Sequence, residues 1–234
     1  MHQPRCQRIA LSSKQSWAVD KPDVAHYIPI GMKIESCSLR GRPREFDPDA
    51  ALAAALQVFW QRGYDGASLS DLTEAMGITK PSLYSCFGNK EELFRRALEL
   101  YERDKLCYTR SALEAETAKG VAERFLRGTV ALQRDDDKDT RACLGVISLV
   151  ACTTQAESIR DQVKARQASS TRALIERFER AQQEGDFPAD LKPDALAAYL
   201  YAVLQGMGVQ SSSGASIEQL EQLVETTLAV WPGR

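Results

Sequence analysis

Residues 68–90 read Ser-Leu-Ser-Asp-Leu-Thr-Glu-Ala-Met-Gly-Ile-Thr-Lys-Pro-Ser-Leu-Tyr-Ser-Cys-Phe-Gly-Asn-Lys. Ser68 predicts the N-cap of a short helix and Gly77 predicts its end, because glycine adopts the left-handed conformation that terminates helices. Thr79 starts a second helix with Pro81 in its first turn, where a missing N–H costs little. We therefore predict two helices that cross steeply at Gly77. Such a unit places its second helix in the major groove of DNA.

Further helices are predicted on both sides of this unit. The one before it starts at the N-cap Asp47 and stops at Gly63, with apolar residues spaced four and seven apart between them. The one after it starts at Asn89, with Glu92 at the reciprocal capping position. Helical segments are then predicted over 90–117, 119–134, 141–153, 155–184, 193–211 and 217–231, the last capped by Ser216 with Gln219. We find no convincing strand and no solenoid repeat, so the predicted fold is all-α.

Positive charge gathers locally in a chain whose net charge is −2. Between Met76 and Lys90 there are two lysines and no acidic residue. Just upstream, Arg40, Arg42 and Arg44 lie on a segment placed to reach phosphates or a minor groove. DNA binding would therefore depend on a local patch, because the bulk charge does not favour it.

The stretch from about Phe46 to Tyr101 resembles the DNA-binding domain of the TetR family of regulators. It carries the family's motifs in order: Gly63-Tyr64, Ser68, Met76-Gly77-Ile78, Leu83-Tyr84-Ser85-Cys86-Phe87 and Lys90. Cys86 departs from the pattern, since the family usually has histidine there, and we leave Cys86 out of the predicted site. The resemblance implies a three-helix helix-turn-helix domain followed by a larger helical domain for ligand binding and dimerisation.

The resemblance also implies which residues contact DNA. The predicted set is Arg42, Arg44, Ser68, Thr79, Lys80, Ser82, Tyr84 and Lys90. Ser68, Tyr84 and Lys90 are expected on phosphates, because hydroxyls donate to phosphate oxygens and lysine releases counterions. The three residues at the start of the second helix are candidates for base edges or nearby phosphates. Outside this motif, Lys80 and Lys90 would be interpreted as surface charges and Tyr84 as a core residue.

The predicted helix 193–211 is apolar nearly all round. A helix without a polar face is buried on both sides, here by its own core and by a second subunit. Together with 155–184 it resembles the helix pair that forms the four-helix dimer interface of TetR-type proteins. We therefore expect a homodimer that binds a palindromic operator. Gly206 and Gly208 within this helix either permit close helix approach or mark fraying.

A pocket for a small-molecule effector is expected among the middle helices. The candidate lining is Phe125, Leu126, Leu132, Cys143, Leu144, Ile147 and Cys152. The alternative is that all of these residues are core. Cys143 and Cys152 are either a redox or electrophile sensor or buried thiols that act as small hydrophobes. All six cysteines are predicted to be reduced, because no CxxC pair occurs and a chain this long needs no disulfide framework.

Other functional classes find little support. Both histidines lie within the first 31 residues, which removes histidine-based triads and metal sites from the folded part, and no phosphate-binding loop is present. We therefore expect no enzyme activity, cofactor or metal. No apolar run approaches the roughly 18 residues of a membrane span. No secretory signal is visible either, so we expect no membrane partner and a cytoplasmic location.

The predicted organisation is a disordered arm over 1–40, the helix-turn-helix domain over 41–101 and the ligand-binding and dimerisation domain over 102–234. Met32 is an alternative start of the chain. The expected function is a repressor released by a small-molecule effector. An activator or a ligand-independent regulator shares every one of these features. A helical interaction module without DNA binding is a further alternative, favoured by Cys86 and the slightly acidic charge balance.

Overall fold

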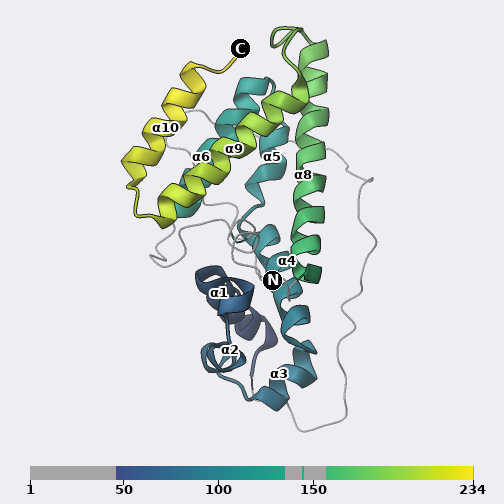
Figure 1. Cartoon of the computed structure of the whole chain (residues 1–234), viewed down its shortest axis with the longest axis vertical. Coiled ribbons are helices and arrows are strands. Elements are labelled where there is room, and N and C mark those ends of the chain that lie inside the picture. The colour runs from purple at the N-terminus through teal and green to yellow at the C-terminus, as the bar shows by residue number, and fades with distance from the viewer. Residues whose placement is uncertain (1–45, 135–143, 145–156, 234) are drawn as a thin grey trace, which may run out of the picture.

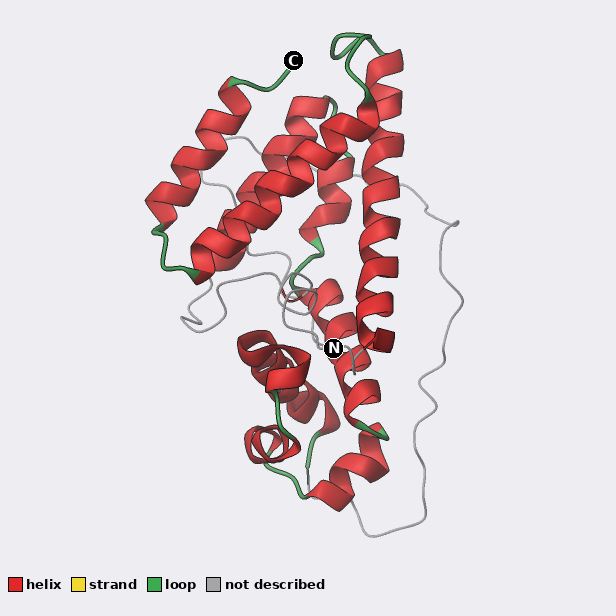
Figure 2. Ribbon diagram, in the orientation of Figure 1, coloured by secondary structure: helices red, strands yellow, loops and turns green. Residues whose placement is uncertain are grey.

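A computed structural model describes residues 46–134, 144 and 157–233 of the chain. All regular elements in these ranges are helices, as Figure 2 shows, which confirms the all-α prediction. In chain order they are α1 (Pro48–Gly66), α2 (Leu69–Met76), α3 (Lys80–Phe87), α4 (Lys90–Asp104), α5 (Tyr108–Leu113), α6 (Ala118–Arg134), α8 (Glu157–Gln183), α9 (Pro193–Ser212) and α10 (Ile217–Ala229). Among these helices, none combines the length and apolarity that a membrane span requires.

The helices form two bodies, one above the other in Figure 1. Helices α1 to α4 make the lower body, and α5, α6, α9 and α10 gather in the upper one, while α8 runs alongside from one to the other. The lower core is tied together by aromatic rings of α1 and α4. Phe59 meets Phe94 edge-on at 5.0 Å, and Trp60 meets Tyr101 at 4.9 Å. Edge-to-face pairs of this kind add to the free energy gained by burying the rings.

The boundary between the two cores does not coincide with position 101. The lower core includes Ile159 and Val163 of α8, together with Leu144. The upper core begins at Ala112 and includes Leu174 and Phe178 of the same helix. Helix α8 therefore contributes apolar side chains to both bodies, and the division of the chain at 101 remains a prediction from sequence.

A buried arginine holds the turn between α5 and α6. Arg177 of α8 donates through Nη2 to the carbonyl oxygens of Ala115 (2.7 Å) and Glu116 (3.0 Å). These carbonyls follow the end of α5, where helical partners are missing. Burial lowers the pKa of the Arg177 guanidinium.

The predicted continuous helix 90–117 is wrong. The chain leaves the helical path between α4 and α5, where the carbonyl of Tyr101 accepts from the backbone N–H of both Lys105 (2.8 Å) and Leu106 (3.3 Å). The break directs Tyr108 towards α6, where its hydroxyl lies 3.2 Å from Thr129 Oγ1. Tertiary packing thus overrides a helical pattern that is continuous in the sequence.

Other predicted helices hold within a few residues: 119–134, 155–184, 193–211 and 217–231 correspond to α6, α8, α9 and α10. The predicted helix 141–153 lies outside the described residues, apart from Leu144. The predicted stop at Gly63 is a kink, because this residue has φ 69° and ψ 178° while the helical assignment continues to Gly66.

Candidate nucleic-acid interface

Helix α2 starts with a complete capping box. The Ser68 hydroxyl accepts from the Asp71 N–H (3.1 Å), and the Asp71 carboxylate accepts from the Ser68 N–H (3.0 Å) and hydroxyl (2.7 Å). Arg62 of α1 adds an ion pair to Asp71 at 2.7 Å. The Ser68 hydrogen bonds and then Arg62 lower the pKa of the Asp71 carboxyl. The box fixes the start of α2 relative to α1.

The turn between α2 and α3 is set by Gly77 and Thr79. Gly77 has φ 65° and ψ 30°, the left-handed conformation, and its N–H donates to Glu74 O at 3.1 Å. Thr79 then caps α3, since its hydroxyl accepts from the Ser82 N–H at 3.3 Å and lies 3.0 Å from Ser82 Oγ. Both helix ends are thus satisfied within the turn, which holds α3 at a fixed angle to α2.

Helix α3 has one buried face and one exposed face. Leu83 and Phe87 enter the lower core. The opposite face consists of Lys80, Pro81, Tyr84 and Ser85, all exposed. The Tyr84 side chain keeps 49% of its surface exposed although it is a large aromatic residue. A short helix with a hydroxyl- and ammonium-bearing outer face, held by its inner face, has the form of a helix that enters a groove.

Helix α4 begins beside α3 and presents Lys90 in its first turn. Asn89 caps the helix by accepting from the Glu92 N–H at 2.8 Å. The Glu92 carboxylate accepts instead from Arg95 and from Arg96, and the Arg95 bond is the main cause of the lowered pKa of Glu92. The Lys90 ammonium lies 4.5 Å above the centre of the Tyr64 ring. This cation–π contact sets where the ammonium sits at the edge of the α3 face.

The part of the chain that the structure describes contains no cluster of three or more His, Cys, Asp or Glu side chains arranged for a metal ion. The exposed face of α3 and the first turn of α4 present hydroxyls, lysines and helix N-termini. These groups bind phosphate oxygens and base edges.

Two family models match the chain. The model of bacterial regulatory proteins of the tetR family matches residues 51–97, and that of the tetracyclin repressor-like C-terminal domain matches residues 123–227. The HTH-type transcriptional repressor ComR of Escherichia coli K12 is 38% identical over 206 residues, which cover 82% of this chain and 92% of ComR. The chain belongs to the TetR family. It is a DNA-binding transcriptional regulator and not an enzyme.

Two further relatives of this TetR-family chain bear on its interface. The HTH-type transcriptional repressor BdcR of Escherichia coli K12 is 29% identical over 182 residues, 77% of this chain and 86% of BdcR. A cysteine mutant of the TetR-family regulator CifR, solved with 26-bp double-stranded operator DNA, is 42% identical with a TM-score of 0.76. That likeness covers 82% of this chain and all of the CifR chain.

The structure brings six of the eight predicted DNA-contacting residues of this TetR-family regulator to α2, α3 and the first turn of α4: Ser68, Thr79, Lys80, Ser82, Tyr84 and Lys90. Arg42 and Arg44 lie outside the described residues. The Ser68 hydroxyl already donates to Asp71, so it would have to exchange that bond to reach a phosphate.

Two further residues lie at this candidate interface that the sequence analysis did not include in the predicted set. Ser85 is exposed beside Tyr84, and its spacing of four from Pro81, opposite Leu83, was the signal that pointed to it. Tyr64 appeared only as half of a family motif, because its contact with Lys90 depends on how α1 packs against α4. Cys86, excluded from the prediction, is half-buried at the edge of the lower core.

The predicted effector-pocket residues do not share one environment. Phe125 and Leu126 are buried in the upper core, whereas Leu144 is buried in the lower one. Leu132 is half-buried on α6. Cys143, Ile147 and Cys152 lie outside the described residues.

The prediction of six reduced cysteines is wrong at Cys107, which is disulfide-bonded. Cys86 is free.

Proposed function

We propose that this regulator represses transcription by binding a palindromic operator as a homodimer, and that a small-molecule effector releases it. The observation that supports DNA binding is the exposed face of α3. This face presents Lys80, Tyr84 and Ser85, whereas the inner face of the helix is apolar. No acidic residue occurs between Met76 and Lys90, so nothing on this face repels phosphate.

In the proposed complex α3 lies in the major groove. Tyr84 and Lys90 bind phosphates on either side of the groove and fix its register, as phosphate contacts do in protein–DNA complexes. Thr79 and Ser82, at the N-terminal end of α3, and Ser85 in its last turn face base edges or nearby phosphates. Arg42 and Arg44 add contacts from the arm.

The homodimer is supported by an exposed apolar face on α9. Ala198, Tyr199, Ala202 and Val209 are exposed at spacings that put them on one side of the helix. Tyr199 keeps 41% and Val209 keeps 53% of its surface exposed. A second copy that covers this face would bury these side chains and set the distance between two α3 helices.

Effector release requires that the upper body influence the lower one. Arg166 of α8 pairs with Glu99 (3.3 Å) and with Glu102, both on α4. Helix α4 follows α3 directly in the chain and is paired with α8 through these side chains. It therefore connects α3 to α8. An effector bound among the middle helices would shift α4 and change the spacing of the two α3 helices.

The test is fluorescence anisotropy with DNA from the region upstream of the protein's own gene, at several salt concentrations. We expect saturable binding that Tyr84→Ala and Lys90→Ala each weaken about tenfold. Lys90→Ala should also reduce the slope of log affinity against log salt by about 1. Lys192→Ala, an exposed lysine at the start of α9, is the matched control and should leave binding unchanged. Binding that both interface variants leave intact would overturn the proposed interface.

A further inference from the structure

Arg62 of α1 reaches across to the start of α2. It stands directly before Gly63, whose φ of 69° kinks the helix. The Arg62 Nη1 atom lies 2.7 Å from Oδ1 of Asp71, and the Arg62 side chain keeps 52% of its surface exposed. The other oxygen of the same carboxylate accepts from the N–H and the hydroxyl of Ser68. One carboxylate therefore holds both Arg62 and Ser68 at the edge of the candidate interface.

Arg62 and Ser68 differ in what they can still donate. The Ser68 hydroxyl has a single hydrogen, and its bond to Asp71 already uses it. The Arg62 guanidinium carries several N–H donors in a planar fork, and its ion pair with Asp71 engages the fork through Nη1. A phosphate could therefore bind the remaining donors of Arg62 without disturbing the capping box, whereas it would have to break that box to reach the Ser68 hydroxyl.

The start of α2 needs a cation if a phosphate is to approach it. Between residues 61 and 75 three side chains are acidic, and Arg62 is the one basic residue. Carboxylates at this distance repel a phosphate. The ion pair with Arg62 offsets the charge of Asp71, which lies closest to Ser68 among these acids. Arg62 therefore makes this end of α2 compatible with the DNA backbone.

We infer that Arg62, held by Asp71, binds a DNA phosphate at the start of α2, and that Ser68 stays within its capping box. The inference rests on the proposed DNA interface and adds a residue to it. Arginine suits the contact because its planar fork can donate two parallel hydrogen bonds to a phosphate. The contact fixes the duplex against α2, as Tyr84 and Lys90 fix it on the side of α3 and α4.

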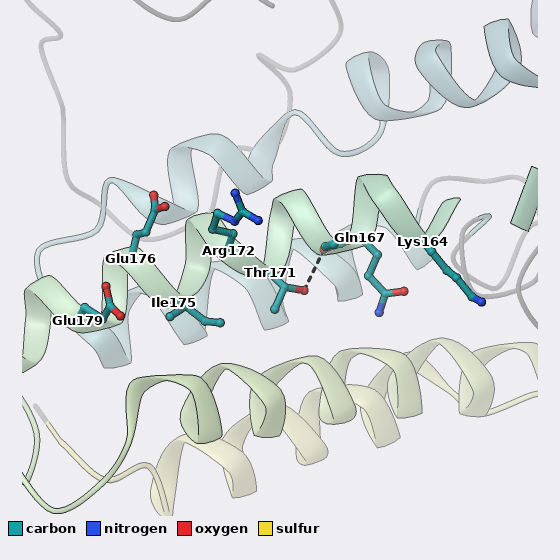
Figure 3. Close-up of a pocket in the computed structure, with 8 residues that line it drawn as sticks. Lys164, Gln167, Thr171, Arg172, Ile175, Glu176 and Glu179 are labelled. Atoms are coloured by element: carbon teal, nitrogen blue, oxygen red, sulfur yellow. Dashed lines mark hydrogen bonds between the residues drawn. The ribbon is translucent and has the colours of Figure 1, made fainter. Parts of the chain in front are cut away.

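The exposed groove along α8 shows the contrast (Figure 3). Lys164 and Arg172 lie in it, but they share it with Glu176 and Glu179. The part of α8 that carries Arg172 packs in the upper core, whereas α3 lies at the opposite end of the molecule (Figure 1). These cations are thus placed away from a duplex bound by α3, whereas Arg62 is tied to α2, the helix that leads into α3.

The first test is fluorescence anisotropy of the full-length chain with a duplex selected from a random-sequence pool, across a salt series. Arg62→Gln removes the charge, so we expect affinity to fall about tenfold and the slope of log affinity against log salt to fall by about 1. Arg62→Lys keeps the charge but not the fork, so it should keep the slope and lose about threefold in affinity. Arg103→Gln is the matched control. Arg103 is also exposed and also pairs with an aspartate at 2.7 Å, but it lies at the end of α4, so the control should change neither quantity.

The second test replaces single phosphates of this duplex by uncharged methylphosphonates. For the unaltered chain, one replacement in each half-site should weaken binding about tenfold, and Arg62→Gln should abolish that effect because the contact is already lost. This readout separates a direct contact from a general change in charge or fold. Ser68→Gly, a substitution that an N-cap tolerates, should retain the effect. Circular dichroism checks that each variant is folded.

Three outcomes would count against this account. A folded Arg62→Gln variant with the original affinity and salt slope would overturn the contact. A methylphosphonate effect that Arg62→Gln retains and Ser68→Gly loses would assign the phosphate to Ser68 instead. Both leave DNA binding by α3 standing. An unaltered chain that enriches no sequence from the pool would overturn the proposed function itself.

Discussion

Tyr64 lies between the core of the lower body and Lys90, the residue that we propose contacts a phosphate. Its ring stacks on Phe59 (6.3 Å, 13°) and meets the edge of Phe94 (5.3 Å, 77°), so the ring plane is fixed by the core. The positive φ of Gly63 turns the chain just before it. The Lys90 ammonium rests on this fixed ring. We interpret Tyr64 as a residue that positions Lys90 for a phosphate.

Replacing Tyr64 tests this role. Tyr64→Phe keeps the aromatic face, so we expect DNA affinity within about twofold of the original. Tyr64→Leu removes the cation–π contact, worth about 0.5–1 kcal/mol, and should weaken DNA binding about two- to fivefold in an anisotropy titration. In a Lys90→Ala background both variants should bind alike. A loss of affinity with Tyr64→Leu that persists without Lys90 would show that the ring acts through the fold only.

Helix caps were the residues that the sequence predicted best. Asp47, Ser68, Thr79, Asn89 and Ser216 all cap the helices expected of them, because a cap depends on three or four neighbouring residues. The Tyr64–Lys90 contact joins positions 26 apart, and no local pattern encodes it. Local sequence patterns therefore predicted where the helices of the candidate interface start, but not the contact with Tyr64 that positions Lys90.

The packing of α5 against α6 depends on the absence of a side chain at Gly128. A Cβ atom at this position would lie 2.2 Å from Cδ2 of Tyr108. We expect Gly128→Ala to lower the free energy of unfolding by about 1–3 kcal/mol, the usual cost of overpacking, measured by urea denaturation. Gly66→Ala is the control, since its added methyl would meet only Arg62 Cβ at 3.4 Å. In the Gly128→Ala variant, a second substitution, Tyr108→Leu, should recover part of the lost stability. Equal stability of the Gly128→Ala and Gly66→Ala variants would contradict the tight contact.

The pairing of α4 with α8 should give stability a distinct pH dependence. Burial raises the pKa of the Glu102 carboxyl, against the opposing effect of Arg166. A raised pKa in the folded state means that the contribution of Glu102 is most favourable at low pH. That contribution is lost as the pH rises through the unfolded and then the folded pKa. Glu102→Gln does not ionise and should therefore gain stability relative to the unaltered chain between about pH 4 and pH 7. The measurement is urea denaturation of both proteins at several pH values. A stability of Glu102→Gln that falls relative to the unaltered chain over this range would contradict the raised pKa of Glu102.

Helix starts were predictable where the neighbouring residues carry a start signal, as at Pro193 of α9 and Ser216 before α10. The break between α4 and α5 was not predictable, because residues 90–117 keep a helical pattern through it. Tyr108 packs on α6, and this contact between distant segments decides where the chain turns. Similarly, an apolar pattern marks Phe125 and Leu144 as buried but does not say that they enter different cores.

The arrangement of the two bodies links the exposed face of α9 to the spacing of the α3 helices. Helix α9 belongs to the upper body, and α1 to α4 form the lower one, as Figure 1 shows. A homodimer formed through the α9 face would carry one α3 helix per subunit, and two-fold symmetry would make the two half-sites an inverted repeat. The spacing of the half-sites is thus a property of the dimer, whereas the sequence of each half-site is a property of α3.

The most direct test of dimeric DNA reading is selection from a random-sequence double-stranded DNA pool with the full-length protein. We expect enrichment of an inverted repeat whose half-site centres lie about 10–10.5 bp apart, or one-turn multiples of that spacing. Tyr84→Ala and Lys90→Ala should enrich it far less. A pool that enriches no sequence, or a single half-site bound by one chain, would contradict the account.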